Sequence, residues 1–323
     1  MTAQCAAVVG IDGGNSKTEV LVASPNGTVL ARRLGPTSSP HLVGLEGTIA
    51  TLRAMLADAL GDVGLSLAAP LAIATCLAGL DLPEEEDEAR AALSTMAPQA
   101  QHVVVNDTFA VLRAGLDGGS EGVAVVCGAG INAVGVGPAG TARFLALGAL
   151  SGDWGGGFGI GEAALGAAVR FEEGRGPMTS LTAAIAASFG FARATDVTVA
   201  IHRRELASAR LAELAPLVVQ HARAGDSLAA QLVDRCAAEV ASFADAALTR
   251  SGLAGAPAHV VLGGSMLAGI DQLIGEIARR HIEVAHPAAQ VRFLAAPPVV
   301  GALAMAFDQL GVVPVRDGWP GSR

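Results

Sequence analysis

Asp12-Gly13-Gly14-Asn15-Ser16-Lys17-Thr18 lies between two apolar runs and contains the only lysine among the 21 Lys and Arg residues of the chain. Glycines let backbone N–H groups approach an anion closely, and the ammonium group of Lys17 adds a positive charge. Asp12 supplies a carboxylate of the type that holds Mg²⁺, directly or through water. The stretch therefore predicts a nucleotide site in which Asp12 holds the metal ion and Gly13, Gly14, Asn15, Ser16, Lys17 and Thr18 surround the phosphates.

The residues after this turn distinguish it from two common phosphate-binding loops, the P-loop and the dinucleotide-binding loop, both of which open a helix. Residues 19–24 and 28–32 are instead typical of strands, and Pro25-Asn26-Gly27 between them is typical of a tight turn. The glycine turn is therefore predicted to be the tip of a β-hairpin.

The same layout occurs a second time in the chain. A strand at 123–127 precedes a glycine turn with Gly128, Ala129 and Gly130, and two further strands follow, separated by a turn at 137–140. Such a repeat is expected of two similar domains that face each other across a nucleotide, although an ordinary meander can also produce it.

Composition limits the possible functions. A chain of 323 residues with 51% hydrophobic and 16% charged residues is long enough for about two domains with well-buried cores. The net charge of −9 disfavours nucleic acid and anionic membranes as partners. No apolar run reaches the roughly 20 residues that span a bilayer, and the first residues do not resemble a signal peptide, so a cytoplasmic protein is expected. Cys5, Cys76, Cys127 and Cys236 have no metal-binding spacing and are expected to be buried thiols.

Two predicted strands carry polar residues at their carboxyl ends. The strand at 71–77 leads to Ala78-Gly79-Leu80-Asp81, and the acidic residues at 84–88 that follow are interpreted as the solvated first turn of a helix. The strand at 102–105 delivers Asn106 and Asp107 to a helix. At this position a carboxylate can contact a ligand, or either residue can simply cap the helix.

Three further loops are candidates for ligand contact. The proline-bounded loop at 35–41 contains Ser39 and His41 and precedes a helix at about 45–60. Residues 147–162 are predicted to form a glycine-rich loop that enters a helix near Glu162; its Asp153, Trp154 and Gly155 could contact a ligand, or Trp154 could anchor the loop in the core. The turn with Gly263, Gly264 and Ser265 either lies against an adenosine or makes a compact connection.

Taken together, these motifs resemble those of the N-acetylglucosamine kinase and BadF/BadG/BcrA/BcrD-type ATPase family of the actin, Hsp70 and sugar kinase superfamily. Residues 10–18 match its first phosphate motif, usually GxDGGGTKT, with Asn15 in place of glycine and Ser16 in place of threonine. Residues 128–132 resemble its second phosphate motif, normally GTGS, and residues 262–265 resemble its adenosine motif. The resemblance covers most of the chain.

The resemblance implies an α/β fold with two actin-like (ribonuclease H-like) domains whose mixed sheets flank a nucleotide cleft. The corresponding domains are 1–115, 116–300 and a last segment at 301–323, whose helix packs back on the N-terminal domain before a flexible tail. It further implies an ATP- and Mg²⁺-dependent kinase that phosphorylates an amino sugar, at its 6-hydroxyl, with Asp107 as the base, and that forms a homodimer. The substrate ligands it implies are Ser39, His41, Asn106, Asp107, Asp153, Trp154, Gly155 and Glu162.

The chain departs from the family pattern on the sugar side. The loop at 38–41 carries Pro40 and lacks the usual asparagine, and residues 159–163 lack the acidic pair of the usual Gly-Asp-Glu-Gly-Ser run, for which Glu162 or Asp153 could substitute. Two alternatives therefore remain: a non-catalytic sugar or nucleotide sensor, and an ATPase that activates an electron-transfer partner through cysteine-bound iron and sulfur.

Overall fold

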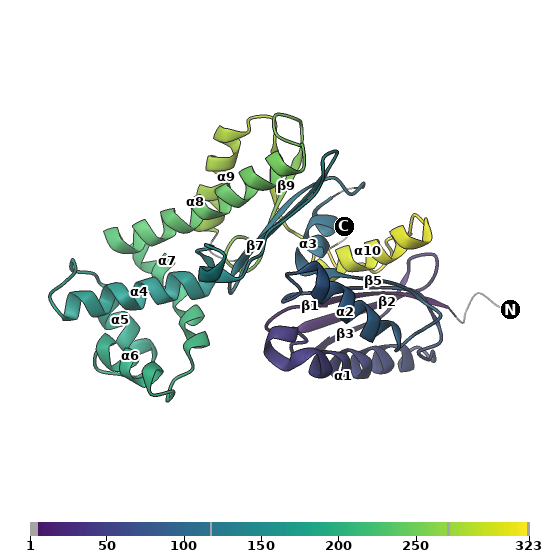
Figure 1. The fold of residues 1–323 in the computed structure, drawn as a ribbon, viewed down its shortest axis with the longest axis horizontal. Helices are drawn as coiled ribbons and strands as arrows, with labels where there is room; N and C mark the ends of the chain where they lie inside the picture. Colours follow the sequence, from purple (N-terminus) through teal and green to yellow (C-terminus); the bar gives the residue numbers. More distant parts are fainter. Residues whose placement is uncertain (1–5, 117, 270–271, 322–323) are drawn as a thin grey trace. The chain divides into compact units, whose positions relative to one another are not determined.

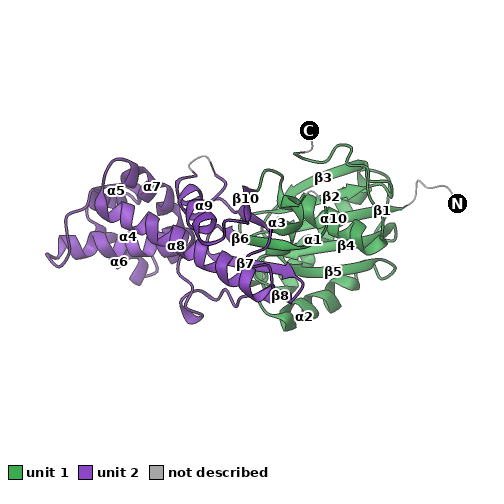
Figure 2. Ribbon diagram, turned by 90° about the horizontal axis from the view of Figure 1, so that it is seen from above, with its two compact units in different colours: residues 1–124, 294–323 green, residues 125–293 purple. Residues whose placement is uncertain are grey.

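The computed structural model describes residues 6–116, 118–269 and 272–321. The chain divides into two compact units, each with its own sheet (Figures 1 and 2). Unit 1 comprises the described residues up to Ala124 and those from Leu294 onward, and unit 2 comprises Val125–Phe293. The divisions predicted from the sequence fall after residues 115 and 300, and the assignment of nucleotide-binding domains to these parts of the chain stays a prediction.

The sheet of unit 1 has the order β3-β2-β1-β4-β5. Its strands are β1 (Ala7–Gly13), β2 (Thr18–Ala23), β3 (Val29–Gly35), β4 (Pro70–Leu77) and β5 (Gln101–Asn106). The first three pair antiparallel, with Gly13 opposite Thr18, so the glycine turn is the tip of a β-hairpin as predicted. β4 pairs parallel with β1 and with β5, which brings the carboxyl ends of β1, β4 and β5 to one edge of the sheet.

Helices cover both faces of this sheet. They are α1 (Pro40–Gly61), α2 (Pro83–Ser94), α3 (Asp107–Gly115) and α10 (Pro298–Leu310). Val9 and Ile11 share one core with Leu52 and Leu56 of α1, whereas Val8 shares the opposite core with Phe307 of α10. Because neighbouring side chains of a strand point to opposite faces, the continuous apolar run of β1 is buried on both sides.

Helix α1 begins at Pro40, earlier than the predicted start near residue 45. The early turn is separated from the rest of the helix by a kink at Gly44, where φ is 69°. Gly44 has non-helical φ and ψ, and a positive φ is accessible to glycine at little cost, so the longer part of the helix begins after Gly44, close to the predicted start.

The C-terminal segment packs on unit 1. A Cβ atom at Gly10 would lie 2.3 Å from the backbone nitrogen of Leu303, so α10 contacts β1 backbone to backbone. The tail beyond α10, expected to be flexible, is held to the hairpin loops: Val29 N donates to Asp317 O at 3.0 Å, and Trp319 Nε1 donates to Gly27 O at 2.6 Å. The Trp319 side chain is buried.

Unit 2 has a sheet of order β10-β9-β6-β7-β8, in which β7 pairs antiparallel with β8 and β9 parallel with β10. Its strands are β6 (Gly122–Cys127), β7 (Ile131–Gly137), β8 (Gly140–Arg143), β9 (His259–Gly263) and β10 (Gln290–Phe293). Strand β6 begins just before the unit boundary. Its helices are α4 (Gly156–Glu172), α5 (Leu181–Ser188), α6 (Ala194–His202), α7 (Ala215–Arg223), α8 (Ser227–Arg250) and α9 (Leu273–Ala285), with 3₁₀ turns η1 (Gly148–Leu150) and η2 (Ser208–Leu214).

The second strand–turn–strand layout is thus present in unit 2 as β6, β7 and β8, and the predicted α/β class with two mixed sheets is confirmed. None of the helices that the structure describes is long and apolar enough to cross a bilayer.

Candidate active site

The tip of the first hairpin is tied to the neighbouring loop and strand. Gly14 N donates to Lys17 O at 2.9 Å and closes the turn, while Ala78 N donates to Gly13 O at 2.8 Å. A Cβ atom at Gly13 would lie 2.3 Å from Ser38 Oγ, so only glycine allows this approach. Asn15, Ser16 and Lys17 are exposed, as residues that reach an anion must be.

Thr18, predicted as a phosphate ligand, is fully buried and donates from Oγ1 to Ser38 Oγ at 2.7 Å. Thr37 Oγ1 donates to Gly14 O at 2.9 Å from the same loop. These hydroxyls hold the loop at 35–41 against the hairpin tip, which brings two sequence-predicted segments together.

Asp12, at the end of β1, lies among other carboxylates. Burial, together with the charges of Asp107 and Glu19, raises its pKa to about 8, and the charge of Lys17 opposes this rise. Among the described residues no group of three or more His, Cys, Asp or Glu side chains could enclose a metal ion. Asp12 supplies one carboxylate, which fits a cation that takes one or two carboxylate oxygens and completes its shell with water and phosphate, as Mg²⁺ does.

Asn106 caps α3, as one of the two alternatives requires. Its Oδ1 accepts from Thr108 N at 3.0 Å and from Thr108 Oγ1 at 2.7 Å. Its Nδ2 donates to Leu80 O at 3.1 Å and to Asp81 Oδ1 at 3.0 Å. An amide offers two N–H donors and two acceptor lone pairs, and here all four have partners within the protein.

Asp107 is the first residue of α3 and lies at the carboxyl edge of the sheet. Burial, together with the charge of Asp81, raises the pKa of its carboxyl to about 7, while hydrogen bonds from the backbone N–H groups of Thr108 and Asp107 oppose the rise. A carboxylate with a pKa near neutrality is suited to accept a proton at physiological pH.

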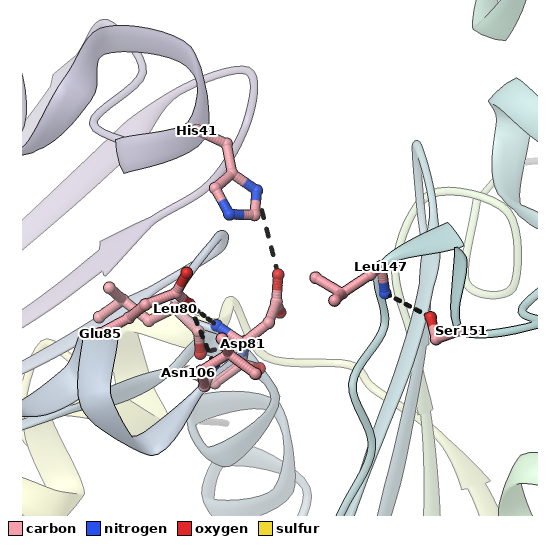
Figure 3. Close-up of polar contacts among 8 residues, drawn as sticks. His41, Leu80, Asp81, Glu85, Asn106, Leu147 and Ser151 are labelled. Carbon is pink, nitrogen blue, oxygen red and sulfur yellow. Dashed lines mark hydrogen bonds and ion pairs between the residues drawn. The ribbon is translucent and has the colours of Figure 1, made fainter. Parts of the chain in front are cut away.

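Asp81 is the residue of this cluster that the sequence analysis missed as a site residue. It follows β4 and is held by Asn106, and the Nδ1 atom of His41 lies 4.0 Å from its Oδ2 (Figure 3). No motif marks an aspartate after Ala-Gly-Leu. The predicted strands at 71–77 and 102–105 could have identified Asp81, because residues that follow neighbouring parallel strands meet at one edge of a sheet.

The acidic segment after Asp81 is only partly a solvated helix turn, so that interpretation is wrong for two residues. Glu85 Oε2 accepts from Asp81 N at 2.8 Å and from Leu82 N at 3.0 Å, which caps α2. Glu86 is buried and its Oε1 accepts from Asn106 N at 2.8 Å. Both carboxylates fix backbone at the site, whereas Glu84 and Glu88 are exposed.

Ser39 and Gly79 lie beside this cluster. The Ser39 side chain is fully buried, and among the described residues its Oγ has no hydrogen-bond partner. At Gly79, where φ is 82°, a Cβ atom would lie 2.9 Å from Ser39 Oγ and 3.1 Å from Cγ of His41. Ser39, His41, Asp81, Asn106 and Asp107 therefore belong to one group in unit 1.

In unit 2, the turn at 128–130 is joined to the start of α4. Gly157 N donates to Gly128 O at 2.7 Å and Phe158 N donates to Ala129 O at 3.0 Å. The helix starts at Gly156 rather than near Glu162, so the prediction of a loop is wrong for residues 156–161. Glycines are needed there for close packing: a Cβ atom at Gly161 would lie 1.9 Å from Leu211 O.

The turn at 263–265 packs against Cys127, at the carboxyl end of β6. Gly264 has a φ of 90°, and a Cβ atom there would lie 2.3 Å from Cys127 O. Gly263 is buried at the end of β9, and Ser265 is exposed. The three glycine-rich segments of unit 2 thus converge around the carboxyl end of β6.

The remaining predicted residues are in or near the loop before α4. Asp153 Oδ2 accepts a hydrogen bond from Ser151 Oγ, which itself accepts from Leu147 N at 2.8 Å (Figure 3). The guanidinium of Arg235 lies 3.8 Å from the ring centroid of Trp154, and Gly155, with a φ of 141°, directly precedes α4. Glu162 is exposed on α4.

The described cysteines Cys76, Cys127 and Cys236 are fully buried, and the sulfurs of Cys127 and Cys236 are 4.0 Å apart. Cys5 lies outside the described residues. Buried thiols were expected, and none of these three presents its sulfur at a surface, where the activating ATPase alternative needs ligands.

The sequence matches the BadF/BadG/BcrA/BcrD ATPase family over residues 9–306. The chain belongs to this family. The chain is similar to N-acetyl-D-glucosamine kinase of Dictyostelium discoideum, with 26% identity over 68% of this chain and 72% of that protein. It is also similar to N-acetylmuramic acid/N-acetylglucosamine kinase of Clostridium acetobutylicum, with 25% identity over 94% of this chain and 98% of that protein. The fold resembles that of a candidate N-acetylglucosamine kinase from Chromobacterium violaceum, with a TM-score of 0.72 and 23% identity over 94% of this chain and 99% of that one.

Proposed function

We propose that this family member is an ATP-dependent sugar kinase that phosphorylates the 6-hydroxyl of N-acetylglucosamine or a related hexosamine. The observation that carries the proposal is Asp107, placed at the carboxyl edge of the sheet beside Asp12 and with a pKa raised to about 7. The family membership and the names of the two relatives support the same activity.

In the proposed reaction, Asp107 accepts the proton of the sugar hydroxyl while its oxygen forms a bond to the γ-phosphorus of ATP. The bond from that phosphorus to the β–γ bridging oxygen breaks, and ADP leaves with the bridging oxygen. Such transfers depend chiefly on the positions of the reacting groups and on neutralisation of the phosphate charge. Asp107 therefore needs both a fixed position, which the start of α3 gives its backbone, and a pKa near that of the medium.

The phosphate-binding groups of unit 1 are the backbone of the hairpin tip and the ammonium group of Lys17. Mg²⁺ held near Asp12 would neutralise phosphate charge, and the mutual repulsion of the carboxylates around Asp12 favours a cation there. By family resemblance, the turns at 128–130 and 263–265 contact the phosphates and the adenosine, respectively.

The test is ADP release from Mg·ATP, without sugar and then with glucosamine, N-acetylglucosamine, N-acetylmannosamine, N-acetylmuramate or glucose. We expect one sugar to stimulate release. In the Asp107→Asn variant kcat should fall by roughly 10²- to 10⁴-fold, the usual contribution of a positioned base, while ATP binding persists.

The Asp308→Asn variant is a matched control, because Asp308 lies in the same unit but pairs with Arg113. Near-normal turnover in Asp107→Asn would refute the assigned base. ADP release that no sugar changes, with ATP still bound, would favour the sensor or the activating ATPase.

A further inference from the structure

Asp81 is held in position by contacts from two other segments of unit 1. Its backbone N–H donates to the carboxylate of Glu85, one turn into α2, and its Oδ1 accepts from the Asn106 amide. The side chain is only 10% exposed. Because the backbone and one carboxylate oxygen are both fixed, the direction of the other oxygen is restricted as well.

Asn106 has a different role from that of the substrate ligand that the family resemblance implies. Both of its Nδ2 hydrogens are used by Leu80 O and Asp81 Oδ1, and its Oδ1 accepts twice from Thr108. A substrate hydroxyl could bind this amide only by displacing one of these bonds. The amide instead joins the end of β4 to the start of α3. Asp81, which follows β4, and Asp107, which follows β5, are therefore positioned together.

The surroundings of Asp81 contain further polar groups suited to a hydroxylated ligand. The imidazole of His41 is 49% exposed and lies 4.0 Å from Asp81 Oδ2. Ser39 Oγ, buried and without a partner among the described residues, faces Gly79 on the same loop as Asp81. Buried hydroxyls normally have a partner, so an orphaned one beside this cluster points to a ligand.

The charge of Asp81 raises the pKa of Asp107, and Asn106, the residue before Asp107, donates a hydrogen bond to Asp81. An ionised carboxylate accepts hydrogen bonds and donates none, and sugar hydroxyls are the matching donors. Hydrogen bonds to a charged acceptor are among the stronger ones in proteins.

We propose that Asp81 binds the acceptor sugar beside Asp107, through a hydroxyl group other than the one that is phosphorylated, and that Asn106 is its positioning residue. The inference rests on the proposed sugar kinase activity and assigns the acceptor carboxylate that residues 159–163 do not provide in the usual form. The matching ligand is a neutral sugar with adjacent free hydroxyls, since Asp81 and Asp107 would repel a carboxylate carried by the sugar.

The experiment measures sugar binding by calorimetry, with N-acetylglucosamine and its 3-deoxy and 4-deoxy analogues, on the parent protein, Asp81→Asn and Asp107→Asn. We expect Asp81→Asn to weaken binding of the parent sugar by about 10- to 100-fold, the range for a hydrogen bond to a charged group. The dissociation constant for ATP should remain within about twofold, since Asp81 is absent from the hairpin tip. Asp87→Asn is the matched control, because Asp87 lies on α2 but is 71% exposed and pairs with Arg90.

The deoxy analogues identify the contact. One of them should bind the parent protein 10- to 100-fold more weakly than the full sugar, and the Asp81→Asn variant should bind that analogue and the full sugar equally. Equal binding of all three sugars to the parent protein would overturn the proposal even if the variant did not fold. Unchanged sugar affinity in a folded Asp81→Asn variant would overturn it too.

The two proposals fail separately. Sugar binding that depends on Asp81, without phosphoryl transfer, would refute the proposed kinase activity but support the sugar-binding role of Asp81. Transfer that depends on Asp107 and not on Asp81 would do the reverse.

Discussion

The pH dependence of turnover is the sharpest consequence of the Asp107 environment. A base must be deprotonated to act, and burial together with the charge of Asp81 raises the pKa of this carboxyl from 3.8 to about 7. At pH 6 about one tenth of the molecules then carry the ionised base, and at pH 8 about nine tenths. We expect kcat/KM for the sugar to rise about tenfold between these values.

The same shift predicts the pH dependence of stability. Between about pH 4 and pH 7 the folded protein keeps a proton on Asp107 that the unfolded chain has lost, so its free energy of unfolding falls as the pH rises. A shift of about three pH units corresponds to at most about 4 kcal/mol. The Asp107→Asn variant lacks this loss, so its stability relative to the parent should improve between pH 4 and pH 8.

The assay is initial-rate ADP release at saturating Mg·ATP from pH 5.5 to 8.5, with urea unfolding measured from pH 4 to pH 8. Asp81→Asn should move the acid limb to lower pH, because it removes a charge that opposes ionisation of Asp107. A flat kcat/KM profile, together with parallel stability curves for the parent and Asp107→Asn, would refute an aspartate with a raised pKa as the base.

Three other predictions address phosphate binding, packing and helix capping. Lys17→Ala should raise the calorimetric dissociation constant for ATP about tenfold or more and that for the sugar much less, and the reverse order would mean that the hairpin does not hold phosphate. Gly301→Ala should cost about 1–3 kcal/mol in urea unfolding, because its Cβ atom would lie 1.9 Å from Ala110 O, whereas Gly166→Ala on α4, which meets nothing within 4 Å, should stabilise by up to about 1 kcal/mol; equal effects would contradict the packing. Asp226→Ala should lower the free energy of unfolding by about 2 kcal/mol at pH 7, because Asp226 caps α8 and also accepts hydrogen bonds from Thr179 and Ser180. These bonds hold the pKa of Asp226 well below its usual range, so the stability difference between parent and variant should shrink below about pH 4. A difference in urea unfolding that does not change with pH would mean that the cap is unimportant.

The hairpin and the strand ends could be predicted from sequence because local patterns determine them. Pro25-Asn26-Gly27 between two runs typical of strands is a turn signal that does not depend on the rest of the chain. Asn106 and Asp107 likewise follow an apolar run closely enough to be placed at a strand end. Both predictions needed only a few neighbouring residues.

Tertiary contacts decided the parts that were missed. The glycines at 156–161 have poor helix propensity, but Gly161 must lie against the backbone of η2, and this contact favours a glycine-rich helix. Asp81 and Glu86 become site residues only through Asn106, which is 25 and 20 positions away, respectively. Contacts across such separations leave no periodic signal.

The placement of α10 has a consequence for synthesis on the ribosome. The face of β1 that carries Val8 is covered by a helix made about 290 residues later, with unit 2 synthesised in between. At about 5–20 residues per second, the 169 residues of Val125–Phe293 take roughly 10–30 s, during which this apolar face has no α10 to cover it. Unit 2 is formed by one continuous segment and can fold before unit 1 is complete. The nascent chain then carries a folded unit 2 and a unit 1 that still lacks α10. A circular permutant that starts at Leu294 would make unit 1 continuous and should shorten this exposed interval.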